Sequence, residues 1–259
     1  MLLWVDGKPV DPEAASVPLL SSSFMFGHGV FETLRTYHGQ VFRLPDHLER
    51  LFDSAMAFEI EPVFSREELE SQLRNMLKEV GWKESRIKIV LIAGHMMVLV
   101  QVLEEKPDYF YQNGVKLACF EGERPLSTVK KIGDSLCFMA NQQAKKQGVY
   151  DSLLVCHDQQ VRECSYANLF WVKNGQLFTP QRGVLHGITR QTVMELAENC
   201  ELSSITYAEL LEVDEVFITQ TSSGILPVVQ IEGQLIGEGI PGRVTVGLME
   251  KFRRKVWNS

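Results

Sequence analysis

Two adjacent runs of apolar, β-branched residues, 86–92 and 96–103, constrain the fold of this chain more than any other feature. Only Ala93-Gly94-His95 separates them, so the two runs predict an antiparallel hairpin with a very short tip. A second hairpin is predicted where Asn174-Gly175 joins 168–173 to 176–179, because this dipeptide suits the tightest turns between strands. The chain must therefore contain antiparallel sheet.

Helical segments are predicted from the spacing of apolar residues. Ser65-x-x-Glu68 is a capping box that opens a helix ending at Gly81, and Pro45 opens an earlier one. Further helices are predicted after Lys130 and over 189–199, and a last one follows Pro241-Gly242. A strand-rich second half with few helices favours an α+β fold over the regular alternation of a doubly wound sheet. The linker-like stretch 104–114 predicts two domains, 1–113 and 114–259.

Composition excludes several classes of protein. The 259 residues are 45% apolar, which is enough for one large or two ordinary cores. A net charge of −7 with dispersed Lys and Arg argues against a nucleic-acid partner. No apolar run approaches a membrane span and the start does not resemble a signal peptide, which predicts no membrane partner and a cytoplasmic location. Five cysteines without C-x-x-C spacing predict reduced thiols, and six histidines without ligand spacing predict no metal.

Three groups between 127 and 190 could together serve an aldehyde cofactor. Lys130 offers an amine, Glu163 a carboxylate that could keep a pyridine nitrogen protonated, and Gly187-Ile188-Thr189 a helix start whose N–H groups could take a phosphate. Each also has an ordinary structural interpretation. Lys130 could be a solvated lysine like its neighbour Lys131, Glu163 an exposed sheet residue, and Gly187 part of a plain helix cap.

Other polar residues could join such a site. Arg50 lies off the apolar stripe of its predicted helix and could clamp a phosphate, and Thr221 and Ser222 could add hydroxyl or N–H donors. Gly27-His28-Gly29 has no third glycine, so it does not complete a dinucleotide-binding fingerprint. Glycines inside this apolar run instead predict close backbone approach or an irregular turn.

Several spaced motifs, in the same order along nearly the whole chain, resemble the class IV aminotransferases, the fold-type IV enzymes that use pyridoxal 5'-phosphate (PLP). This family contains branched-chain and D-amino-acid aminotransferases and aminodeoxychorismate lyase. The matching segments are Phe26-Gly27-His28-Gly29-Val30-Phe31-Glu32-Thr33, His47-Leu48-Glu49-Arg50-Leu51, Lys130 with Gly148-Val149-Tyr150, Glu163-x-Ser165-x-Ala167-Asn168-Leu169-Phe170, Leu185-His186-Gly187-Ile188-Thr189-Arg190 and Thr221-Ser222-Ser223-Gly224-Ile225-Leu226-Pro227-Val228.

The resemblance implies a role for each matched residue. Lys130 would be the Schiff-base lysine and Glu163 the partner of the pyridine nitrogen, with Phe31 beside the active site. It also implies a small N-terminal α/β domain, a larger C-terminal domain with a barrel-like sheet, an amino-acid-like substrate and a homodimer. The phosphate would be held by Arg50, Ile188, Thr189, Thr221 and Ser222.

The reaction is predicted from conflicting signals. The segment 163–171 resembles the lyase branch, whereas 220–224 resembles the transaminases. We expect an aminodeoxychorismate lyase, which converts 4-amino-4-deoxychorismate to 4-aminobenzoate and pyruvate, with a branched-chain or D-amino-acid aminotransferase as the alternative. A non-catalytic PLP-binding or interaction protein is a third possibility. The short tip at 93–95 lacks the arginine with which relatives take a substrate carboxylate, and Arg124 or His95 is the suggested substitute.

Overall fold

The contacts of the chain divide it into two compact units. The structure, a computed structural model, describes residues 1–258. The first unit contains Met1–Glu104, Val129–Asp134 and the residues from Val256, and the second contains Glu105–Thr128 and Ser135–Lys255. A single boundary at 113/114 therefore does not describe these units, because Val129–Asp134 belongs with the N-terminal residues. The linker-like composition of 104–114 marks where the chain first passes from one unit to the other. It does not indicate that a later segment, Val129–Asp134, belongs to the first unit again.

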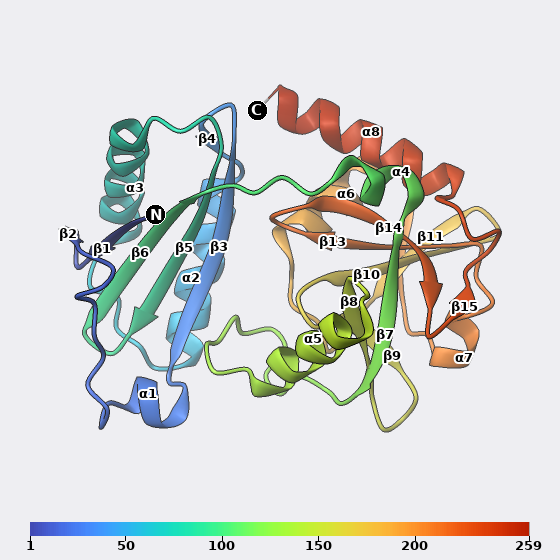
Figure 1. The fold of residues 1–259 in the computed structure, drawn as a ribbon, viewed down its shortest axis with the longest axis horizontal. Coiled ribbons are helices and arrows are strands. Elements are labelled where there is room, and N and C mark those ends of the chain that lie inside the picture. Colours follow the sequence, from blue (N-terminus) through green and yellow to red (C-terminus); the bar gives the residue numbers. More distant parts are fainter. Residues whose placement is uncertain (259) are drawn as a thin grey trace. The chain divides into compact units, whose positions relative to one another are not determined.

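The first unit is built on a six-stranded antiparallel sheet (Figure 1) with the order β2-β1-β6-β5-β3-β4. The predicted hairpin at its centre is confirmed, since Ile92 pairs with His95 across a tight turn. The strands are β1 (Leu2–Val5), β2 (Lys8–Val10), β3 (Gly29–Tyr37), β4 (Gln40–Val41), β5 (Ser85–Ile92) and β6 (His95–Val102).

Two helices, α2 (Leu44–Ala57) and α3 (Arg66–Val80), cover one face of this sheet. The capping box of Ser65 and Glu68 at the start of α3 is confirmed. Apolar residues of both helices pack with alternate residues of the strands, including Ile87 and Ile89 of β5. The residues between them, such as Lys88, therefore lie on the other face of the sheet. A short helix, α1 (Ser22–Phe26), precedes β3.

The second unit contains a closed ring of six strands, which confirms the predicted α+β fold with a barrel-like sheet. The ring closes where Glu163 of β9 pairs with Asn168 of β10. Its strands are β7 (Val115–Glu121), β8 (Asp151–Val155), β9 (Val161–Cys164), β10 (Asn168–Lys173), β13 (Glu215–Gln220) and β14 (Gly224–Ile231); β11 (Gln176–Pro180), β12 (Cys200–Ser203) and β15 (Gln234–Leu235) extend the sheet. A ring of this size is filled by side chains.

The helices of the second unit differ in detail from the predicted segments. Residues expected to form a linker make a short helix, α4. In α5 the buried residues are Cys137, Ala140 and Ala144, whereas Met139, whose spacing from Leu136, Ala140 and Ala144 predicts the same apolar face, is exposed. The predicted helix 189–199 ends at Leu196. The helices are α4 (Asp108–Asn113), α5 (Ser135–Gln147), α6 (Ile188–Leu196), α7 (Tyr207–Leu210) and α8 (Arg243–Trp257).

All five cysteines are free, and three of them are buried. Within residues 1–258, no three His, Cys, Asp or Glu side chains gather as metal ligands would. Across the same residues, no helix combines the length and the apolar composition that a membrane crossing requires.

Candidate functional site

The backbone of Lys130 is fixed within the first unit. The Phe31 N–H donates to the Lys130 carbonyl at 2.8 Å, and the Ile132 N–H donates to the Gly29 carbonyl at 2.9 Å. The Lys130 N–H in turn donates to Ser54 Oγ on α2 at 3.3 Å. The segment around Lys130 therefore runs along the start of β3 as an added piece of antiparallel sheet, and Lys130 starts from a rigid base.

The glycines before β3 permit this close approach. A Cβ at Gly29 would lie 2.6 Å from Ile132 Cδ1, and a Cβ at Gly27 would lie 3.1 Å from Gly133 Cα. Gly27 also has a left-handed backbone, φ +63°, which side chains disfavour. The predicted close approach is thus confirmed, and it involves protein backbone.

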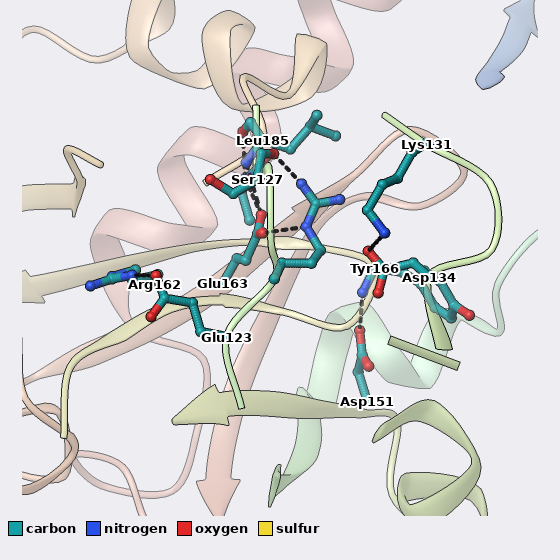
Figure 2. Close-up of polar contacts among 11 residues, drawn as sticks. Glu123, Ser127, Lys131, Asp134, Asp151, Arg162, Glu163, Tyr166 and Leu185 are labelled. Atoms are coloured by element: carbon teal, nitrogen blue, oxygen red, sulfur yellow. Dashed lines mark hydrogen bonds and ion pairs between the residues drawn. The ribbon is translucent and has the colours of Figure 1, made fainter. Parts of the chain in front are cut away.

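The structure distinguishes Lys130 from Lys131. The Lys130 ammonium lies 4.6 Å from the centroid of the Phe31 ring. Lys131 Nζ instead lies 3.6 Å from a carboxylate oxygen of Asp134, a contact drawn in Figure 2. One lysine is therefore paired with an acid, and the other lies against an aromatic ring, where the ring quadrupole attracts a cation.

Arg50, one of the predicted phosphate residues, is bound to an acid that the sequence analysis did not single out. Its Nε and Nη2 donate to the two oxygens of Glu32 at 2.6 and 2.8 Å. Glu32 is fully buried in β3, and His47 of α2 contacts it through Nδ1 at 2.8 Å. This geometry is the bidentate fork that holds a guanidinium in one plane.

The charges of this cluster follow from burial and pairing. Burial acts to raise the pKa of Glu32, but Arg50 and the His47 hydrogen bond outweigh it and hold that pKa far below its ordinary value. Burial lowers the pKa of His47 in spite of the neighbouring carboxylate. His47 is therefore neutral at pH 7, and its Nδ1–H donates to Glu32, which can only accept.

Glu163 occupies the closing strand of the ring in the second unit, and its side chain is 6% exposed. One oxygen accepts from Arg124 Nε at 2.9 Å, and the other accepts from the Leu185 N–H at 3.0 Å and from Asn168 Nδ2 at 3.4 Å (Figure 2). Arg124 also donates to the Ser127 carbonyl. The carboxylate is thus held from both sides.

The start of α6 adjoins this acid. Asn168 Nδ2 also donates to the Leu185 carbonyl at 2.8 Å, and Gly187 is the N-cap of α6 without any side-chain cap. A Cβ at Gly187 would lie 2.1 Å from Asn168 Oδ1, so this packing requires glycine. The N–H groups at Ile188 and Thr189 therefore begin a helix where the dipole favours an anion.

Thr221 and Ser222 lie in the turn between β13 and β14. The next residue, Ser223, is buried and anchors this turn: its hydroxyl contacts Tyr150 Oη at 3.4 Å, and its carbonyl accepts from Tyr111 Oη at 3.1 Å. Hydrogen bonds with two tyrosines therefore hold the turn that carries the two predicted phosphate residues.

The two residues suggested for a substrate carboxylate already have acidic partners. Arg124 contacts Glu163, as described above. His95 lies at the tip of the β5–β6 hairpin, with a side chain that is 60% exposed and Nδ1 2.8 Å from Asp6. Each of these two side chains is therefore already in contact with an acid.

Comparison with known proteins identifies the family. The family model "Amino-transferase class IV" matches residues 29–231. The chain belongs to the class IV aminotransferases. It is 29% identical to a D-alanine aminotransferase of Bacillus licheniformis, over 99% of this chain and 97% of the relative. Among solved structures, a branched-chain aminotransferase of Thermoproteus uzoniensis with norvaline matches at 30% identity and TM-score 0.90, covering 100% of this chain and 95% of the other. A second branched-chain amino acid aminotransferase, solved with pyridoxamine 5'-phosphate, matches at 26% identity and TM-score 0.91, covering 98% and 93%.

These matches confirm the resemblance to class IV aminotransferases and the fold it implied. They do not favour the predicted lyase, because the relatives named above are aminotransferases of D-alanine or of branched-chain amino acids. The segment 163–171, from which the lyase was predicted, contains the end of β9, the bend at 165–167 and the first part of β10. A short local likeness there carries less weight than similarity along the whole chain.

Proposed function

We propose that this protein is a PLP-dependent aminotransferase that acts on branched-chain or D-amino acids. The observation that carries the proposal is the nearly full-length similarity to a D-alanine aminotransferase and to branched-chain aminotransferases, with coverage above 90% of both partners in each comparison. An aminotransferase is accordingly favoured over the lyase predicted from the sequence. A homodimer and a cytoplasmic location remain predictions.

The residues present fit the proposed cofactor. Glu163 is a buried carboxylate, Gly187 begins a helix without a side-chain cap, and Lys130 stands on a rigid backbone. When bound, PLP supplies a protonated ring that withdraws electrons from the substrate Cα. Taken by their chemistry, these donors suit an aldehyde, a basic ring nitrogen and a phosphate, the three groups that PLP carries.

Each residue has a defined task in this proposal. Lys130 would hold the cofactor aldehyde through Nζ, and its amine would be the base that takes the proton from the substrate Cα. Glu163 would accept the ring N–H and keep that nitrogen protonated. Phe31 packs beside the amine of Lys130. Arg50, Ile188, Thr189, Thr221 and Ser222 hold the phosphate.

A substrate panel tests the reaction. The purified protein with PLP is given L- and D-amino acids with 2-oxoglutarate in one series and 4-amino-4-deoxychorismate in another. We expect oxo-acid exchange in the first series, with the preferred hand and side chain identifying the substrate. Pyruvate release from 4-amino-4-deoxychorismate without any exchange in the first series would instead select the lyase, which the likeness of 163–171 to that branch keeps as the second candidate.

Matched lysine variants test the assignment of Lys130. The Lys130→Ala variant should lose the visible absorbance of the bound cofactor and the borohydride-stable label on the protein. The Lys131→Ala variant should keep both, because Lys131 is paired with Asp134. Peptide mass spectrometry locates the label. A label that persists in Lys130→Ala would remove Lys130 from this role.

A further inference from the structure

The imidazole of His47 lies among charged groups from three segments of the first unit. Glu32 of β3 accepts its hydrogen bond, and the charges of Arg50 on α2 and of Lys130 also act on it. The carboxylate of Asp46, next to His47 on α2, is itself paired with an arginine. Two cations and an imidazole therefore surround the single carboxylate of Glu32, and such an excess of positive charge attracts an anion.

One ring nitrogen of His47 is engaged and the other is not. Nδ1 lies 2.8 Å from Glu32, and the His47 side chain is 2% exposed. Within residues 1–258, Nε2 of this ring makes no hydrogen bond. Because Nδ1–H donates to Glu32, Nε2 carries a lone pair that can accept a hydrogen bond or a proton. A buried acceptor without a partner indicates a place where a ligand can bind.

His47 also lies on the same helix face as Arg50, three residues later in α2. Arg50 is a proposed phosphate residue, but its Nε and Nη2 already donate to Glu32, and that carboxylate balances its charge. A phosphate ester carries a charge of about −1.5 to −2 at pH 7. Arg50 therefore orients a phosphate but supplies little net positive charge, and a second cation beside it would stabilise the anion.

We propose that His47 takes up a proton when a phosphate binds beside Arg50, so that its imidazolium bridges Glu32 and the phosphate. The proposal rests on the proposed function, since the phosphate is that of PLP. A proton leaves the solvent and forms a new N–H bond at Nε2, while Nδ1 keeps its own hydrogen. Both hydrogen bonds of the ring are then charge-assisted, which is the stronger class.

The proton is expected only with the anion in place. Without it, burial first, and then the charges of Arg50 and Lys130, lower the pKa of His47 against the opposing effect of Glu32. A negative charge at Nε2 favours the protonated ring and raises that pKa again. Binding is then coupled to proton uptake, so the affinity for phosphate should fall as the pH rises, by up to about tenfold for each pH unit.

Calorimetry of the protein freed of cofactor tests this coupling with pyridoxine 5'-phosphate, which lacks the aldehyde that would react with Lys130. Titrations in two buffers with different ionisation enthalpies count the protons bound with the ligand. At about pH 7.5 a phosphate ester, with a second pKa of about 6, is already a dianion. We expect uptake of about 0.5 to 1 proton by the unaltered protein.

Matched histidine variants assign the proton. His47→Asn can donate an amide N–H to Glu32 in place of Nδ1–H but cannot be protonated, so it should lose this uptake and about 10- to 100-fold in affinity. His157→Asn alters another histidine paired with a glutamate, Glu121, whose imidazole is 91% exposed, and it should keep both. The ring nitrogen of the ligand is the same in every titration, so the difference between the variants isolates His47.

Nitrogen NMR of the unaltered protein labelled in histidine gives a second measurement that needs no variant to fold. The His47 ring should change from neutral to protonated when phosphate is added. A ring that stays neutral in the complex, the absence of proton uptake, or equal uptake in His47→Asn would each overturn the proposal.

Inorganic phosphate, titrated in parallel, separates this proposal from the proposed function. A protein that shows the proton uptake but transaminates no amino acid would contradict the proposed function and leave the role of His47 standing. A protein that transaminates without proton uptake would do the reverse. Failure to bind either phosphate would contradict both.

Discussion

Each unit of the molecule buries one glutamate against an arginine, and the two pairs are built differently. In the first unit Glu32 is fully buried and takes both Nε and Nη2 of Arg50, with His47 as a further donor. In the second unit one oxygen of Glu163 accepts from Nε of Arg124, and the other accepts from the backbone N–H of Leu185.

The difference shows which member of each pair is being positioned. Glu32 reaches two residues of α2, His47 and Arg50, which are three apart and so lie on one helix face. It therefore fixes α2 to β3 and orients Arg50. Glu163 is itself held, by a side chain on one oxygen and by backbone on the other. Glu32 therefore positions its neighbours, whereas Glu163 is itself positioned, as its proposed role toward the cofactor ring would require.

Replacing Glu32 should give the largest effect of any change to these pairs. Glu32→Gln leaves Arg50, with a side chain that is 10% exposed, without its counter-charge. Breaking a buried pair from one side costs about 3–5 kcal/mol of unfolding free energy. Urea unfolding of the protein without cofactor measures this loss of unfolding free energy. The double variant Glu32→Gln with Arg50→Met should recover part of the loss, and no recovery would refute the coupling.

The effect of Glu32→Gln on the unfolding free energy should depend on pH. The folded-state pKa of Glu32 is lowered from 4.5, so its contribution is complete above that value and is lost as the pH falls through the folded-state pKa. The gap in unfolding free energy between the unaltered protein and Glu32→Gln should therefore narrow below pH 4.5. A gap that stays constant would show that the carboxylate charge is not what stabilises the pair.

The matching change in the second unit should affect catalysis more than folding. Glu163→Gln keeps the shape of the side chain but cannot hold a proton on the ring nitrogen. We expect kcat to fall about 100- to 1000-fold, as when one preorganised electrostatic partner is removed, with a smaller loss of stability than in Glu32→Gln. Kinetics with the preferred amino acid and thermal unfolding on the same samples measure both. A Glu163→Gln variant that loses stability and keeps its kcat would contradict this contrast between Glu32 and Glu163.

Much of this arrangement could be predicted from local patterns. Alternation and short turns predicted the β5–β6 hairpin, the capping box predicted α3, and ordered motifs singled out Lys130 and Glu163. These signals lie within a few residues of one another, where the spacing of side chains along a strand or helix determines which face they share.

What could not be predicted depends on contacts between distant residues. Val129–Asp134 joins the first unit through backbone hydrogen bonds to β3, and although glycines predicted a close approach there, no pattern identified this segment as the partner. Arg124 and Glu163 are 39 residues apart. Glu32 did leave a usable signal, since it falls on the same side of β3 as the buried Val30 and Leu34, where an unpaired charge is rare. Its partners on α2 could not be read from that pattern.

Two arginines whose ion pairs are drawn in Figure 2 offer the finest test of the comparison, because one pairs with a buried glutamate and the other with an exposed one. Arg124→Met removes the cation from Glu163, which is 6% exposed, and we expect a loss of about 1.5–3 kcal/mol in unfolding free energy. Arg162→Met removes the partner of Glu123, which is 51% exposed, and should cost about 1 kcal/mol or less because water screens the pair. Urea unfolding of both variants measures the difference, and equal losses would mean that Glu163 is held by Leu185 and Asn168 without help from Arg124.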